Sequence, residues 1–294
     1  MGFHFPDIPP FWERLQGFEA LIGRSVTILS IYWSWGLGYS EVPREWMESI
    51  LRKGRRPLVT WEPWMLPDDF NNPSPSIEDP RFKLTNILNG SFDEYIRFGA
   101  AAMKALPGRI YLRPMHEMNG NWYPWCGTTN GNSPGEFILA WRHVHHIFSQ
   151  EDVQNVDWVW CPYAISVPSE QEISAYYPGD QYVDWLALDG YNWGDSRSWS
   201  SWQNFAHLFH DSYGALTALS DKPLMIAELG CAESGGSKSD WITEAHHHVT
   251  ASFPRVKAVV WFNLDKECDW RIESSPDTLA AFRRSWSQNS SLSA

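Results

Sequence analysis

Short apolar, β-branched runs alternate along the chain with longer segments whose apolar positions recur every three to four residues. The first pattern predicts buried strands, and the second predicts amphipathic helices that pack against them. Pro43 and Pro134 suit a first helical turn, and Ser91 and Asp240 are suitable helix caps. The expected strands are residues 2–5, 25–33, 56–64, 109–117, 156–163, 184–193, 222–230 and 256–263, and the expected helices are residues 11–22, 43–52, 91–106, 134–148, 202–219 and 240–253.

This alternation predicts an α/β fold with a parallel sheet. Repetition over eight strand-like runs favours closure into a (β/α)8 TIM barrel of a single domain. An open doubly wound sheet usually has a glycine-rich phosphate turn after its first strand, and the sequence shows none. We assign residues 1–284 to the barrel domain, residues 285–294 to a polar C-terminal tail, and the proline-rich residues 71–80 to a loop.

Aromatic residues and net charge narrow the choice of partner. The chain has 19 tryptophans, 11 tyrosines and 15 phenylalanines. Because an indole N–H needs a partner when buried, many of these rings are expected to be half-exposed stacking surfaces in a groove. The net charge of −12, without a basic cluster, disfavours nucleic acid and remains compatible with a neutral polymer.

The spacing of the cysteines and the first residues of the chain bear on disulfide bonds, metal sites and localisation. Cys126, Cys161, Cys231 and Cys268 have wide, irregular spacing that defines no zinc site and no dense disulfide framework, and leaves one or two bridges open. No signal peptide and no membrane-length apolar run is visible. We expect a monomer that is secreted after removal of a signal peptide not present in this chain, needs no metal or cofactor and contacts no membrane.

Two predicted strands end in a glutamate. The fourth run ends in His116-Glu117, and the seventh places Glu228 after five apolar residues. A buried carboxylate is costly unless it is paired or functional, and the C-terminal strand ends of a barrel form its active site. On strands four and seven the two glutamates would face each other across the barrel mouth. Such a pair indicates glycoside hydrolysis, in which one carboxyl protonates the glycosidic oxygen and the other attacks the anomeric carbon or activates water.

Other strand-end residues fit supporting roles. Glu117 is the candidate acid/base, because the adjacent rings lower the local polarity and favour a raised carboxyl pKa. His116 would donate to a substrate hydroxyl, Tyr191 would offer its hydroxyl to the nucleophile Glu228, and Trp261 would form the floor under the reacting sugar. The outer candidates for stacking further sugars are Trp33, Trp35, Trp64, Trp125 and Trp193.

Simpler explanations exist for single residues. Either glutamate alone could be a buried partner of Arg113, with about even odds. His116-Glu117 lacks the second histidine of a zinc-protease HExxH motif. The histidine pair at 145–146 and the histidine triplet at 246–248 lie in predicted helices, where adjacent side chains point in different directions. These histidines therefore suit packing or surface positions better than metal binding.

The segment Arg113-Pro-Met-His-Glu-Met-Asn-Gly-Asn-Trp-Tyr-Pro-Trp125 closely resembles the acid/base signature of glycoside hydrolase family 26. The likeness extends to residues 61–64, 187–193 and 226–230. It implies a retaining (β/α)8 glycosidase with Glu117 as acid/base and Glu228 as nucleophile. It also implies that His116 contacts substrate, Trp122 lines the aglycone side, Tyr191 orients the nucleophile, and Trp261 forms the central platform.

One departure from this family affects the substrate. Mannanases of the family commonly carry an early Gly-His-Gln segment, whereas the second strand here ends in Tyr32-Trp33-Ser34-Trp35. That ending resembles the mixed-linkage β-glucanases, so the first choice is an endo-acting β-1,3-1,4-glucanase of the lichenase type. A β-1,4-mannanase and a β-1,3-xylanase stay open, as does transglycosylation. A non-catalytic carbohydrate-binding barrel is the alternative of another class.

Overall fold

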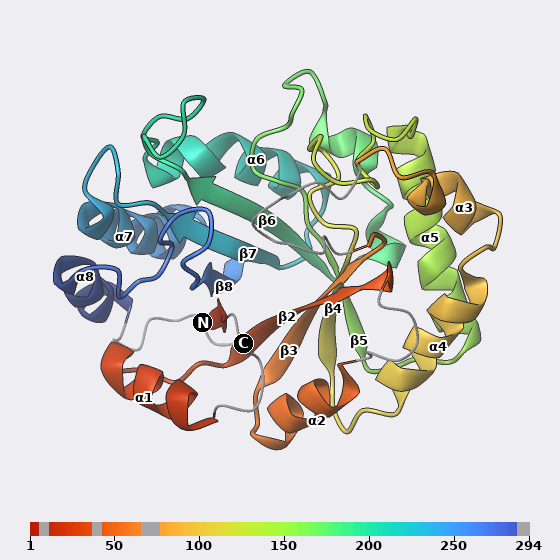
Figure 1. Ribbon diagram of the computed structural model, residues 1–294, viewed down its shortest axis with the longest axis horizontal. Coiled ribbons are helices and arrows are strands. Elements are labelled where there is room, and N and C mark those ends of the chain that lie inside the picture. The colour runs from red at the N-terminus through yellow and green to blue at the C-terminus, as the bar shows by residue number, and fades with distance from the viewer. Residues whose placement is uncertain (6–11, 37–42, 66–76, 287–294) are drawn as a thin grey trace. The chain divides into compact units, whose positions relative to one another are not determined.

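Parallel strands form a closed barrel in the order β1 to β8 in the computed structural model, which describes residues 1–5, 12–36, 43–65 and 77–286 (Figure 1). This confirms the predicted (β/α)8 fold class. The strands are β1 Gly2–His4, β2 Ile28–Ser34, β3 Arg56–Glu62, β4 Ile110–Pro114, β5 Val156–Trp160, β6 Trp185–Asn192, β7 Leu224–Cys231 and β8 Val256–Phe262. The α-helices are α1 Trp12–Ile22, α2 Arg44–Arg52, α3 Leu84–Leu88, α4 Asp93–Lys104, α5 Pro134–Gln150, α6 Phe205–Leu219, α7 Lys238–His247 and α8 Pro276–Trp286.

Two helices and two helix caps differ from the sequence prediction. Helices α3 and α8 were not predicted. Ser237, rather than Asp240, caps α7 by accepting a hydrogen bond from the Asp240 amide, and α4 begins after Phe92 without a side-chain cap, so Ser91 is not its cap either. Pro134 does begin α5, behind a Ser133 cap. Residue 11 of the first predicted helix, residues 71–76 of the predicted loop and residues 287–294 of the predicted tail lie outside the described residues.

Contacts divide the chain into two compact units, Met1–Ser30 with Ala187–Ala294 and Ile31–Leu186. In the first unit β1 pairs with β2 and with β8, and a Cβ at Gly2 would lie 2.7 Å from Ile28 Cβ. Strands β7 and β8 pair with a register shift between Ile226 and Leu229. Glu228 lies within this irregular stretch, where three residue steps of β7 match two of β8, as in a β-bulge.

The second unit packs a cluster of aromatic rings beneath α4. Trp61 on β3 lies 5.4 Å from Trp33, 4.9 Å from Trp35 and 6.0 Å from Tyr95 between ring centroids. Gly99 of α4 leaves room for this cluster, because a Cβ there would be 2.8 Å from Trp61 Cζ2. Trp33 and Trp35 are therefore core residues that join β2 to the helix, and the expectation that they stack sugars is wrong.

The four cysteines carry free thiols. Cys126, Cys161 and Cys231 are buried, and burial raises the pKa of the Cys126 and Cys231 thiols to about 12. These thiols act as small apolar side chains.

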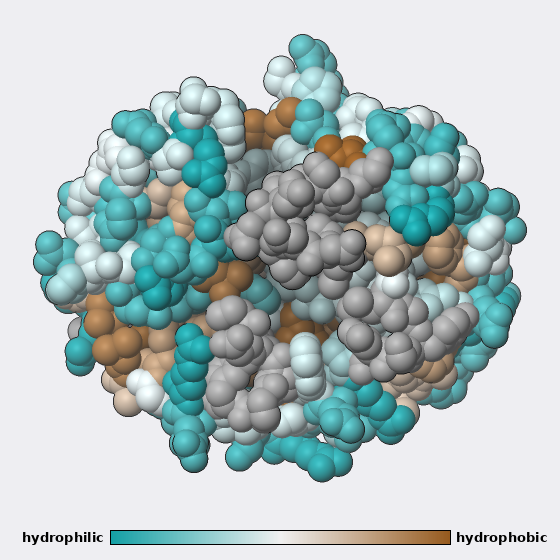
Figure 2. Space-filling model, viewed as in Figure 1, coloured by the Kyte–Doolittle hydropathy of each residue, from teal (hydrophilic) through white to brown (hydrophobic). Residues whose placement is uncertain are grey.

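No helix among the described residues combines the length and apolar character that crossing a bilayer requires. The face shown in Figure 2 is mainly hydrophilic, with hydrophobic residues in separate patches.

Gly99→Ala tests the packing of Trp61 beneath α4, and Gly214→Ala in α6 is its control. We expect Gly99→Ala to lower the free energy of unfolding by about 1–3 kcal/mol, because the new methyl group overlaps Trp61. Gly214→Ala in α6, where nothing lies within 4 Å of the new Cβ, should raise the free energy of unfolding by about 0.5–1 kcal/mol. Urea unfolding followed by tryptophan fluorescence measures both. If both variants raised the free energy of unfolding, or both lowered it, the close contact between Gly99 and Trp61 would be contradicted.

Candidate functional site

The chain after β4 adopts an unusual backbone that presents His116 and Glu117. Met115 and Glu117 have φ values of 49° and 54°, which non-glycine residues rarely adopt. The Met115 amide donates to the Trp61 carbonyl at 3.1 Å, and the Glu117 amide donates to the Cys161 carbonyl at 2.7 Å. Hydrogen bonds to the ends of β3 and β5 thus hold this segment in place. Strained residues of this kind cluster at functional sites.

Glu117 is 5% exposed, and its carboxyl group is held by an aromatic donor. The Trp122 indole N–H donates to Glu117 Oε2 at 2.6 Å. A Cβ at Gly120 would lie 2.6 Å from the Trp122 ring, so glycine is needed for the ring to fold back over this turn. Trp122 also meets Tyr163 edge to face at 5.2 Å. The sequence between Glu117 and Trp122 therefore builds a turn that brings the indole to the carboxyl group.

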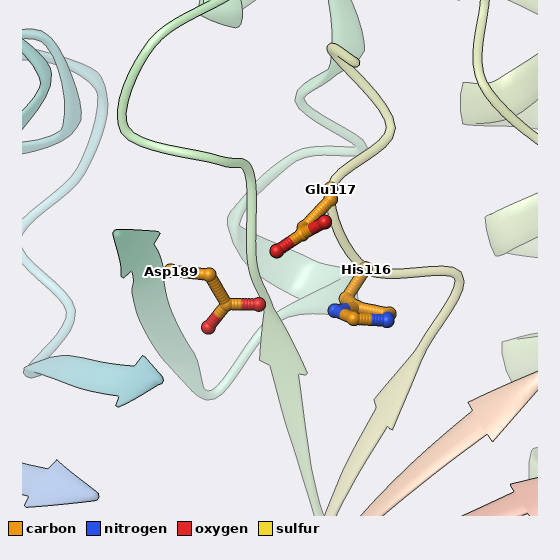
Figure 3. A group of neighbouring side chains, drawn as sticks. All are labelled: His116, Glu117 and Asp189. Atoms are coloured by element: carbon orange, nitrogen blue, oxygen red, sulfur yellow. The ribbon is translucent and has the colours of Figure 1, made fainter. Parts of the chain in front are cut away.

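His116 is buried and has a carboxylate partner that sequence reasoning missed. Its Nε2 lies 3.2 Å from Oε1 of the buried Glu62, at the end of β3. Glu62 Oε2 accepts a hydrogen bond from the Trp64 indole at 3.1 Å. Figure 3 shows the His116 and Glu117 side chains leaving the same stretch of chain. Glu62 could have been found from its place at a strand end after the apolar residues of β3, the same signal that identified Glu117 and Glu228.

Trp125 was expected to stack a sugar, and the structure contradicts this. The ring is fully buried, its indole N–H donates to the His116 carbonyl at 2.7 Å, and it stacks on Tyr123 at 4.3 Å. This hydrogen bond holds the backbone of His116 in place. Trp64 and Tyr123 are partly exposed, and their rings meet edge to face at 5.2 Å. Beside His116, these two rings, unlike Trp125, have a face that a sugar could contact.

Glu228 lies in the bulge of β7 and is 5% exposed. The Tyr191 hydroxyl, from β6, donates to Glu228 Oε2. A Cβ at Gly230 would be 2.7 Å from the Tyr191 ring, so this glycine allows the ring to lie over β7. The predicted contact between Tyr191 and Glu228 is thus present in the structure. A hydroxyl donor favours the ionised form of a carboxyl group.

Trp261 was expected to form the floor under a sugar, and this too is wrong. Its ring is fully buried, donates to the Trp270 carbonyl at 2.8 Å, and meets Trp241 of α7 edge to face at 6.2 Å. Successive side chains of a strand point to opposite faces, so Trp261 faces the helices. The next residue, Phe262, instead meets Tyr191 at 5.6 Å.

The loop between β8 and α8 completes the surroundings of Tyr191. Trp270, from this loop, lies 5.0 Å from Tyr191 and 4.8 Å from the partly exposed Trp193. The loop is anchored by Lys238, whose buried ammonium donates to the carbonyls of Asp269 and Arg271. Burial lowers the pKa of Lys238. A buried cation thereby holds the loop that supports the tyrosine.

Among the described residues, His116, Glu117 and Asp189 carry atoms of the kind that bind metal ions. In the second unit, His116 and Glu117 are adjacent, but His116 is hydrogen-bonded to Glu62 and Glu117 to Trp122. Asp189, also drawn in Figure 3, is a buried residue of β6. Four ligands with tetrahedral geometry define structural zinc sites. The expectation that no metal is needed stays a prediction.

Comparisons with known proteins point to one family. The model of the family described as glycosyl hydrolase family 26 matches residues 57–286. Endoglucanase H of Acetivibrio thermocellus is 38% identical over 285 residues, which are 96% of this chain and 30% of that protein. The mannan endo-1,4-beta-mannosidase A and B of Caldalkalibacillus mannanilyticus is 30% identical over 186 residues, which are 61% of this chain and 32% of that protein.

The same fold occurs in solved structures. The catalytic domain of the GH26 endo-beta-1,4-mannanase of Bacillus sp. JAMB-750 superposes with a TM-score of 0.70 at 17% identity, covering 98% of this chain and 85% of that one. The chain spans about a third of the length of the two relatives named above. The family model covers far more than half of the chain, and the predicted resemblance is confirmed: the chain belongs to glycosyl hydrolase family 26, a family of glycoside hydrolases.

Proposed function

We propose that this chain is a retaining endo-β-glycanase in which Glu117 is the acid/base and Glu228 is the nucleophile. The observation that carries the proposal is a pair of buried carboxyl groups, following β4 and within β7, each of which accepts a hydrogen bond from an aromatic side chain. A purely structural carboxylate has no need of a strained backbone or a bulge to present it. Membership of a glycoside hydrolase family supports the same assignment.

The hydrogen bond from Trp122 defines how Glu117 would donate a proton. An indole N–H can only donate, so Oε2 acts as an acceptor and a proton on this carboxyl group resides on Oε1. In the first step, the Glu117 proton passes to the glycosidic oxygen as the bond to the anomeric carbon breaks. In the second step, the Glu117 carboxylate takes a proton from the attacking water.

The hydrogen bond from Tyr191 suits Glu228 to the opposite role. The Tyr191 hydroxyl donates to Glu228 Oε2 and stabilises the ionised carboxylate, which is the form that attacks. Attack on the anomeric carbon gives a glycosyl ester of Glu228 and releases the leaving alcohol. Water then attacks the same carbon, the ester bond breaks, and the Glu228 carboxylate is restored. Two displacements at one carbon retain its configuration.

His116 would bind a hydroxyl of the sugar next to the cleaved bond. Glu62 holds its Nε2, and the Trp125 indole holds its backbone carbonyl. A ring fixed at both points loses little conformational entropy on binding substrate. We propose Trp122, Trp64 and Trp193 as sugar contacts as well, because each keeps a partly exposed ring.

The substrate we propose first is a mixed-linkage β-1,3-1,4-glucan. The relative that matches over 96% of this chain is named an endoglucanase, and β2 ends in Tyr32-Trp33-Ser34-Trp35 where family mannanases carry Gly-His-Gln. A β-1,4-mannan is the second candidate, since other relatives are named mannosidases. We further propose that the enzyme works as a secreted monomer on this polysaccharide.

A panel of soluble polysaccharides tests the substrate. We expect the protein to shorten mixed-linkage β-glucan, detected by reducing ends and by a rapid fall in viscosity that marks endo action. Galactomannan, glucomannan and β-1,3-xylan are the comparison substrates. Activity on mannans or on the xylan alone would contradict the first choice of substrate and leave the catalytic assignment standing.

Carboxylate removal tests the two roles. Glu117→Ala and Glu228→Ala should each lower kcat/KM on the polysaccharide by about 10²–10⁴-fold or more. With an aryl glycoside and azide present, Glu228→Ala should form a glycosyl azide of inverted configuration, and Glu117→Ala one of retained configuration. NMR of the products distinguishes the two. Azide products of identical configuration in both variants would refute the assignment, and circular dichroism checks that each variant folds.

Tyr191→Phe tests the donor to Glu228. The variant keeps the ring over Gly230 and removes only the hydroxyl. We expect kcat to fall by about 10- to 100-fold, because one charge-assisted hydrogen bond is lost. The acidic limb of the kcat/KM profile should move to higher pH, because the ionised form loses a stabilising donor. Tyr177→Phe, which removes a hydroxyl bonded to Asp180 between β5 and β6, is the matched control and should change neither quantity.

A further inference from the structure

The segment between β6 and α6 carries the most exposed of the large hydrophobic side chains identified in the described part of the chain. Trp199 is 70% exposed, compared with 40% for Trp46, the next such tryptophan. Tryptophan is enriched at binding surfaces, where its apolar ring can cover a ligand while its N–H stays near water. The tryptophan is not one of those that sequence reasoning selected as sugar contacts.

Trp199 is joined to Tyr191 through one intervening ring. Trp193 lies 6.3 Å from Tyr191 and 5.2 Å from Trp199 between centroids. Trp193 itself packs edge to face on Trp270 at 4.8 Å, and the guanidinium of Arg197 lies 5.6 Å from its centroid. Trp193 therefore shares its ring between protein neighbours and solvent, whereas Trp199 is mostly exposed.

Several hydrogen bonds tie down the backbone segment that carries Trp199. Asn192 Oδ1 accepts hydrogen bonds from the amides of Gly194 and Gln203, at 3.1 and 3.0 Å. Ser200 Oγ donates to the Gly194 carbonyl at 2.7 Å, and Arg197 Nη2 donates to the Glu267 carbonyl at 2.6 Å. These bonds close both ends of the segment and tie its middle to the loop before α8. The backbone on either side of Trp199 is thus already ordered, which lowers the entropy that binding a ligand there would cost.

We propose that Trp199 is a distal subsite that stacks against a pyranose ring of the polysaccharide, away from the cleaved bond. The inference rests on the proposed function and names a residue beyond it. A neutral β-linked sugar chain is the fitting ligand, because its C–H faces match an aromatic surface. Its location follows from the row Tyr191, Trp193, Trp199: a chain whose reacting sugar lies at Glu228 extends along this row to Trp199.

Kinetics on long and short substrates test the subsite. Trp199→Ala should raise the KM for the polysaccharide by about tenfold, the size expected when one face of a ring is no longer covered. Its kcat should stay within about twofold, and hydrolysis of an aryl glycoside too short to reach Trp199 should not change. Trp199→Phe should restore part of the affinity, because a smaller aromatic face remains. Trp46→Ala, which removes an exposed tryptophan on α2, should behave as the parent protein.

An equal loss on both substrates would overturn the subsite, as would an unchanged KM for the polysaccharide in Trp199→Ala. Retardation in gels that contain the polysaccharide measures binding without cleavage. If the parent protein is retarded but cleaves no glycan, the catalytic proposal fails, and loss of retardation in Trp199→Ala still supports the subsite. Equal retardation of Trp199→Ala and the parent protein, or no retardation of either, would refute it.

Discussion

Two buried carboxyl groups each receive a hydrogen bond from an aromatic side chain, and much of the local structure around them serves to place those donors. Glu117 receives the Trp122 indole, and Glu228 receives the Tyr191 hydroxyl. Both donors need a glycine nearby, Gly120 for the indole and Gly230 for the tyrosine ring. An unpartnered carboxylate at such positions would be costly. The glycines, the donors and the carboxyl groups therefore form one interdependent arrangement.

The support extends outward from each donor. The segment that carries Glu117 is strained and is held by the carbonyls of Trp61 and Cys161. The tyrosine that contacts Glu228 packs on Trp270, whose loop is anchored by the buried ammonium of Lys238. Catalytic geometry usually depends on such outer contacts, because a shift of about 1 Å at the reacting atoms can cost on the order of 100-fold in rate.

Strand position could be predicted from sequence, and so could the polar residues at strand ends, because apolar runs and their charged ends are local features. The face of a strand that a ring occupies changes when its position along the strand changes by one residue. An apolar run does not reveal which of the two faces points to the helices. Trp33 and Trp261 illustrate this: each lies on the helix-facing side, where Trp33 packs on Trp61 and Trp261 meets Trp241, and in β8 the neighbouring Phe262 contacts Tyr191 instead.

Other features required contacts between distant parts of the sequence. The bulge of β7 is defined by its pairing with β8, and the role of Glu62 appears only when His116 is placed beside it. Helix α8 begins at Pro276, a usable start signal, but its packing through Phe282 and Trp286 is tertiary. Exposure of Trp199 depends on the loop network around it, so tryptophan content alone could not single it out.

The proposed mechanism requires that Glu228 become covalently linked to the sugar. An activated 2-deoxy-2-fluoro glycoside of the preferred sugar should inactivate the protein and leave a stable glycosyl ester, which peptide mass spectrometry can locate. The account predicts a single label on Glu228, and protection by substrate. A label on another carboxylate, or a product of inverted configuration formed without any covalent intermediate, would contradict it.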